Sequence, residues 1–149
     1  MREQIPIASD HAGFEMKEKL RKTLEELGYE PKDLGAKTEE ATDYPDYAHA
    51  AAKMVSEGKA KRGVLLCGSG IGMDITANRY KGVRAGVIWN RELADLSRRH
   101  NDLNMLVLPA RFLDDEKATE ILKTWLETPF EGGRHERRVE KIDGTAKAR

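Results

Sequence analysis

The sequence predicts an α/β fold, a Rossmann-like three-layer α/β/α sandwich with a five-stranded, mostly parallel sheet. Short apolar runs of strand length alternate along the chain with longer segments whose apolar residues recur at helical spacing. This alternation implies crossover helices that cover both faces of a parallel sheet. A length of 149 residues is enough for a proper core. We therefore expect residues 1–149 to form a single domain.

Two strands and two helices are expected in the first part of the chain. Residues 5–8 form the predicted first strand, with Pro6 at its beginning because proline lacks a ladder donor. A helix follows, since four apolar residues recur at helical spacing: Met16, Leu20, Leu24 and Leu27. A weak strand over residues 29–34 comes next. Pro45 then suits the first turn of a helix that has an apolar stripe and ends at Gly58.

The other three strands continue the alternation. They are predicted over residues 63–67, 83–89 and 104–108. Asn90 is a good N-terminal cap for the helix after the fourth strand. Another helix begins at residues 114–115, with a core face of Ala118, Ile121, Leu122, Trp125 and Leu126. Residues 129–133 break that helix, and residues 134–142 form the last one.

Composition excludes several classes of protein. The 26 basic and 26 acidic residues give zero net charge, which argues against a general nucleic-acid or anionic-membrane binder. No apolar run approaches the length of a membrane span, and the first residues lack the apolar core of a signal peptide. The single cysteine excludes an internal disulfide and suits a reducing compartment, so the cytoplasm is expected. Residues 144–149 are expected to be a loose polar tail.

A glycine-rich turn follows the third predicted strand, which ends at Cys67. Glycine at 68, 70 and 72 lets the backbone approach a ligand, and amide groups at a helix start favour negative charge. The spacing matches neither a Walker loop nor a dinucleotide fingerprint. Two interpretations stay open: an anion cradle beside a reactive thiol, or a plain turn in which Cys67 is a small buried hydrophobe.

Other candidates each have a structural explanation as well. Asp10 and His11 occupy a strand-to-helix loop at the same sheet edge as Cys67, where Asp10 also suits a helix cap. His100 lies where a helix ends before a strand, and an imidazole there interacts favourably with the helix dipole. Tyr44 is also explained as a packing or surface aromatic. Arg111, just past the fifth strand, is also explained as a surface cation.

Two arginines on the last helix favour phosphate binding. Arg134 and Arg138 are four residues apart, so both lie on one helix face. Their planar guanidinium groups suit the paired oxygens of a phosphate. The alternative is a solvated charged face, partly balanced by Glu136 and Glu140.

Together these motifs resemble a known family, the type B ribose-5-phosphate isomerases, within a wider group that includes galactose-6-phosphate isomerase subunits. The resemblance covers nearly the whole chain. Five motifs match in the order and spacing of the family: residues 9–14, 42–45, 67–72, 98–104 and 132–139.

The resemblance implies an aldose–ketose isomerase of the non-oxidative pentose phosphate pathway that interconverts D-ribose 5-phosphate and D-ribulose 5-phosphate, with no metal or cofactor. It implies that His100 opens the sugar ring with Asp10 as proton partner, and that Cys67 moves the proton between carbons two and one. Ser69 would hydrogen-bond the reacting oxygens. Backbone amides would hold the enediolate oxygen, supplied by Gly68, Gly70, Ile71 and Gly72.

The resemblance also assigns the rest of the substrate. Arg134 and Arg138 would bind the phosphate with His11 nearby, and Tyr44 and Asn101 would contact the sugar. Arg111 would reach in from a neighbouring subunit. The family forms dimers or tetramers with shared sites, so the C-terminal helix, from about residue 134 to 145, is expected to pack on a partner subunit.

Some members of the family lack the cysteine and use a glutamate after the glycine loop instead. Met73 occupies that position here, so the chain is of the cysteine type, and the neighbouring Asp74 is not expected to be the base. Three alternatives stay open: an isomerase of allose or galactose 6-phosphate, a non-catalytic nucleotide-binding module, and a cysteine-dependent phosphatase. Cysteine-dependent phosphatases need an arginine that closes the phosphate loop a few residues after the cysteine, and this chain has Ile71, Gly72 and Met73 there.

Overall fold

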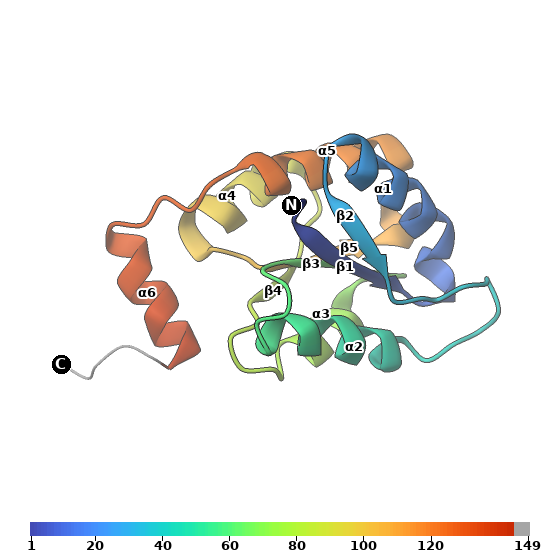
Figure 1. The fold of residues 1–149 in the computed structure, drawn as a ribbon, viewed down its shortest axis with the longest axis horizontal. Helices are drawn as coiled ribbons and strands as arrows, with labels where there is room; N and C mark the ends of the chain where they lie inside the picture. Colours follow the sequence, from blue (N-terminus) through green and yellow to red (C-terminus); the bar gives the residue numbers. More distant parts are fainter. Residues whose placement is uncertain (145–149) are drawn as a thin grey trace.

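A computed structural model describes residues 1–144 as one parallel sheet between two layers of helices (Figure 1). Residues 145–149, most of the predicted tail, lie outside the described part. The strand order is β2-β1-β3-β5-β4, and every pairing is parallel. The strands are β1 (Gln4–Ser9), β2 (Glu30–Asp33), β3 (Gly63–Cys67), β4 (Ala85–Val87) and β5 (Met105–Pro109).

The helices divide between the two faces as the alternation predicted. One face is covered by α1 (Phe14–Glu26), α4 (Arg91–Asn101) and α5 (Asp115–Glu127), the other by α2 (Tyr44–Ser56) and α3 (Ile71–Ala77). The last helix, α6 (Arg134–Asp143), projects from the body of the molecule beside α4 (Figure 1). Short 3-10 turns, η1 (His11–Gly13) and η2 (Ala110–Phe112), follow β1 and β5.

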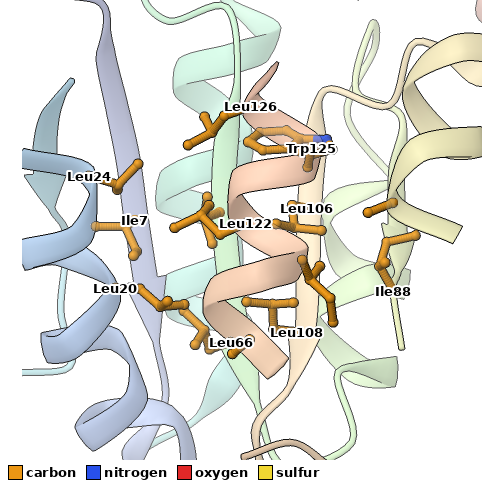
Figure 2. Packing of buried hydrophobic residues seen from close by; sticks show 14 of the residues in the cluster. Ile7, Leu20, Leu24, Leu66, Ile88, Leu106, Leu108, Leu122, Trp125 and Leu126 are labelled. Atoms are coloured by element: carbon orange, nitrogen blue, oxygen red, sulfur yellow. The ribbon is translucent and has the colours of Figure 1, made fainter. Parts of the chain in front are cut away.

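Two apolar clusters hold the layers together. Figure 2 shows the first, in which α1 and α5 pack on one face of the sheet through Leu20, Leu24, Leu122, Trp125 and Leu126. Side chains alternate along a strand, so Leu66 faces this cluster whereas Leu65 and Cys67 face α2 and α3. The sulfur of Cys67 therefore lies on the α2–α3 side of the sheet.

The predicted fold class is confirmed, and the strand boundaries differ most from the prediction in β1 and β4. β1 begins at Gln4, so Pro6 lies inside the strand and not at its start. Its pairing with β3 begins only at Ile7, so the proline stands ahead of that ladder and removes no hydrogen bond from it. β4 has only three residues, although Ile88 after it still donates a hydrogen bond to the Val107 carbonyl of β5 at 3.0 Å.

The parallel arrangement gives the sheet two chemically different edges. At the carboxyl edge, Cys67 at the end of β3 lies opposite Pro109 at the end of β5. At the amino edge, the chain returns from α4 into β5, where the Asn104 carbonyl accepts a hydrogen bond from the Gly63 amide at 2.9 Å. β5 spans about 13 Å between these edges, at roughly 3.3 Å per residue.

Candidate active site

Cys67 ends β3 with its side chain 5% exposed, beside the glycine loop. Burial raises the pKa of the Cys67 thiol, and the carboxylate of Asp10 acts in the same direction. Backbone amides of Met73 and Gly70 oppose this by hydrogen bonding to the sulfur, as does the Arg111 guanidinium, so both lower the pKa. Burial is the largest of these effects, so the pKa of the thiol lies above its ordinary value although the two amides and Arg111 favour the anion.

The glycine loop has a backbone that side chains would disturb at two positions. Gly70 has φ of 80°, a left-handed conformation, and it precedes the first turn of α3. A Cβ at position 72 would lie 2.3 Å from the Tyr44 ring, so glycine is needed for that ring to pack here. The Ser69 hydroxyl accepts a hydrogen bond from the Ile71 amide at 3.3 Å, which holds the loop closed. Tyr44 therefore lies directly beside the loop, and its contact with the sugar stays a prediction.

Arg111 also lies against this loop, and it comes from the same chain. Its amide donates to the Gly68 carbonyl at 3.0 Å, and its side chain packs where a Cβ on Gly68 would be, with Cδ and Nη1 both 3.2 Å from that point. Arg111 therefore contacts the glycine loop of its own chain, and its reach into a neighbouring subunit stays a prediction. The η2 turn after β5 brings it to Cys67.

The loop after β1 completes this cluster. Asp10, 7% exposed, caps η1, since its Oδ1 accepts hydrogen bonds from the Ala12 and Gly13 amides at 3.0 and 3.2 Å. The structural explanation of Asp10 thus holds, and the same residue lies near Cys67. The His11 ring is fixed through Nδ1, which accepts from the Thr42 amide at 3.2 Å. Nε2 is therefore the protonated nitrogen of the neutral His11 ring.

A second cluster lies away from the first. His100, in the last turn of α4, stacks on His135 in the first turn of α6, with ring centroids 4.3 Å apart and planes at 13°. The Glu131 amide donates to the Arg99 carbonyl at 3.1 Å, which joins the start of α6 to the end of α4. Asn101, Arg134 and Arg138 belong to these same helix ends. This histidine cluster is at the amino edge of the sheet.

One chain therefore does not bring all the predicted site residues together. The carboxyl-edge cluster contains Cys67 and the residues that touch its loop or precede it: Asp10, His11, Tyr44, Gly68, Ser69, Gly70, Ile71, Gly72 and Arg111. The amino-edge cluster contains His100, Asn101, Arg134 and Arg138. The length of the sheet separates the two groups.

Asp74 has a structural partner within its own chain. Its Oδ1 accepts a hydrogen bond from Asn78 Nδ2 at 2.6 Å, and Asn78 bonds both the amide and the carbonyl of Ala85 at 2.9 Å. Burial raises the pKa of Asp74, and the bond from Asn78 lowers it. Asp74 thus orients the amide that ties α3 to β4.

His135 is the site-region residue that analysis of single positions missed. It lies within the matching motif of residues 132–139, but its contact with His100 links positions 35 apart in sequence. Ligand atoms of His100, Glu131 and His135 lie within 4.8 Å of one another. Imidazole lone pairs lie in the ring plane, so two parallel stacked rings do not converge on one ion, and the arrangement is not a metal site.

No helix in residues 1–144 has the length and apolar character needed to cross a bilayer.

Comparison with known proteins identifies the family. The ribose/galactose isomerase family profile matches residues 5–142. The chain is 42% identical over 139 residues to ribose-5-phosphate isomerase B of Escherichia coli strain K12, covering 93% of each chain. A ribose 5-phosphate isomerase structure from Thermotoga maritima has a TM-score of 0.92 at 49% identity and covers 97% of this chain and 99% of that one. A structure of ribose-5-phosphate isomerase B from Mycoplasma genitalium with bound ribulose-5-phosphate has a TM-score of 0.92 at 38% identity, covering 97% and 96%. The chain belongs to the ribose/galactose isomerase family.

Proposed function

We propose that this chain is an aldose–ketose isomerase that interconverts D-ribose 5-phosphate and D-ribulose 5-phosphate. The observation that carries the proposal is the position of Cys67, the only cysteine, which ends β3 at the carboxyl edge beside the glycine loop, where the Gly70 and Met73 amides lower its pKa. Ligands of parallel sheets bind at this edge. The Mycoplasma genitalium relative with bound ribulose-5-phosphate supports the same substrate.

The carboxyl-edge cluster suits the proton transfer. Cys67, as thiolate, takes the proton from carbon two and returns it to carbon one of the enediolate. Amides of the residue 68–72 loop, with the Ser69 hydroxyl, stabilise the oxygen that becomes negative. Donors of this kind contribute about 3 kcal/mol each to the transition state in comparable sites. Arg111 favours the negative charge on both the sulfur and the enediolate, because it lies against Gly68.

The amino-edge cluster suits ring opening and phosphate binding. His100 transfers the proton that opens the furanose ring, assisted by Asp10. Arg134 and Arg138 bind the phosphate, together with His11. These roles need both clusters around one substrate, whereas one chain holds them at opposite edges of its sheet.

A second copy of the chain resolves this separation. In a two-fold dimer each chain presents its carboxyl edge to the amino edge of the other, so two identical sites form. A hollow of about 540 Å³ runs along the outer strand β4 between the edges and includes His100, Asn101, Leu93 and Ile142. Leu93 and Ile142 are 43% and 63% exposed, which suits a buried contact between copies. The helix α6, with Arg134 and Arg138, then packs on the partner, and a dimer, or a tetramer built from two dimers, completes the site.

Substrate preference is tested with a coupled assay of the purified protein after EDTA treatment. We expect turnover of ribose 5-phosphate that survives chelation and exceeds turnover of allose 6-phosphate. Preference for the six-carbon ester would favour the related hexose activity of the family, and tight nucleotide binding without turnover of either sugar would favour the nucleotide-binding module.

The assigned base is tested with the variant Cys67→Ala. We expect isomerisation to be lost while binding of the phosphate sugar, measured by calorimetry, survives. Turnover near the wild-type level in this variant would remove Cys67 from the chemistry.

A further inference from the structure

The stacked pair of His100 and His135 has a feature that the proposed function leaves unexplained. A catalytic histidine is usually oriented by a hydrogen bond to its second ring nitrogen. Within residues 1–144, no hydrogen bond reaches the ring of His100. The contact that fixes the plane of this ring is the face of His135, 4.3 Å away and nearly parallel.

His135 is itself held firmly enough to serve as a support. It is 5% exposed, and its amide donates to the Gly132 carbonyl at 3.0 Å. Gly132 and Gly133 have φ of 70° and 56°, left-handed conformations that set the entry of the chain into α6. The Nε2 atom of His135 is buried without a hydrogen-bond partner, and the nearest carboxylate oxygen, of Glu131, is 3.8 Å away. The contact of His135 with His100 is thus made by the face of the ring and not by its Nε2 atom.

We infer that His135 is a positioning residue that orients the His100 imidazole for ring opening through face-to-face stacking. The inference rests on the proposed isomerase function and deepens it. Because His135 directly follows Arg134 on α6, one helix carries both the proposed phosphate ligands and the support for the ring-opening base. The same helix therefore presents the phosphate ligands and orients His100.

The test uses variants that separate the flat ring from its nitrogens. His135→Phe keeps a flat ring, whereas His135→Ala and His135→Asn both remove it. We expect kcat to fall up to about 100-fold in the Ala and Asn variants, the size of effect that a 1 Å misplacement can produce. The Phe variant should keep kcat within about threefold of wild type. His49→Ala, which removes an exposed imidazole in edge contact with Tyr80, is the matched control and should leave turnover unchanged.

A deuterium isotope effect distinguishes positioning from a general loss of structure. With ribose 5-phosphate labelled at carbon two, the wild type should show a primary effect on kcat. In the Ala and Asn variants ring opening becomes limiting, so this effect should fall toward unity while KM changes little. The inference would be overturned by an unchanged isotope effect in both the Ala and Asn variants. It would also be overturned if the Phe variant were as impaired as the Ala variant while circular dichroism showed a native fold. Absence of wild-type turnover would instead refute the proposed function.

Discussion

Sharing of the active site between two chains predicts that two inactive variants restore activity when they are mixed. Cys67→Ala removes the base at the carboxyl edge, and His100→Asn removes the ring-opening group at the amino edge. In a mixed dimer one site carries both substitutions, and the other carries neither. Random exchange of subunits makes about half of the dimers mixed, with one intact site of two, so activity should return to about one quarter of the wild-type value.

The experiment exchanges subunits by mild denaturation and refolding of the two purified variants, followed by the coupled isomerase assay. The structure supplies a matched control, because Asp10→Asn lies at the same edge as Cys67. A mixture of Cys67→Ala and Asp10→Asn places at least one substitution in every site and should stay inactive. If the first mixture stays inactive while gel filtration with differently tagged chains detects mixed dimers, the shared site is refuted.

Two further predictions concern the charge on Cys67 and the stability of the fold. Arg111→Ala removes a cation that lowers the pKa of Cys67, so this pKa should rise and the thiolate absorbance of the only cysteine should appear at higher pH. Arg111→Lys should largely restore the wild-type titration, and identical curves for all three proteins would contradict the assigned contact. Lys17 is fully buried and bonds both Asp33 oxygens at 2.8 and 2.9 Å, so Lys17→Met should lower the free energy of unfolding by about 3 kcal/mol in urea titrations. A loss below about 1 kcal/mol would show that Asp33 finds other partners.

The half of the site at the carboxyl edge was predictable from sequence because it depends on local pattern. An apolar run that stops at Cys67 and turns through glycines fixes a strand end and a helix start, and parallel strands end at a common edge. The contact of the Arg111 side chain with the glycine loop was not predictable, since it depends on how η2 folds back over Gly68. The shared site, the oligomeric state and the cytoplasmic location stay predictions.

The separation of His100 from Cys67 was implied by the chain order. A helix that ends before a parallel strand ends at the amino edge, whereas Cys67 ends a strand at the carboxyl edge. The order of the matching motifs indicates which residues act together in one site. It does not indicate that two copies of the chain supply those residues. No pattern in the sequence predicts that His135 stacks on His100, because neither helix periodicity nor local spacing relates the end of α4 to the start of α6.

The two edges also differ in how firmly their side chains are held. At the carboxyl edge, Asp10 accepts two amide hydrogen bonds, His11 is fixed by Thr42, and amides hold the sulfur of Cys67. At the amino edge, the histidine stack fixes the first turn of α6 and an ion pair of Arg84 with Asp143 at 2.7 Å fixes its last turn, while the helix projects from the body of the molecule. Proton transfer at carbon tolerates little misplacement, since about 1 Å can change the rate by about 100-fold. The firmly held edge therefore suits that step, and the helix that projects from the body suits the phosphate, which must enter and leave in every turnover.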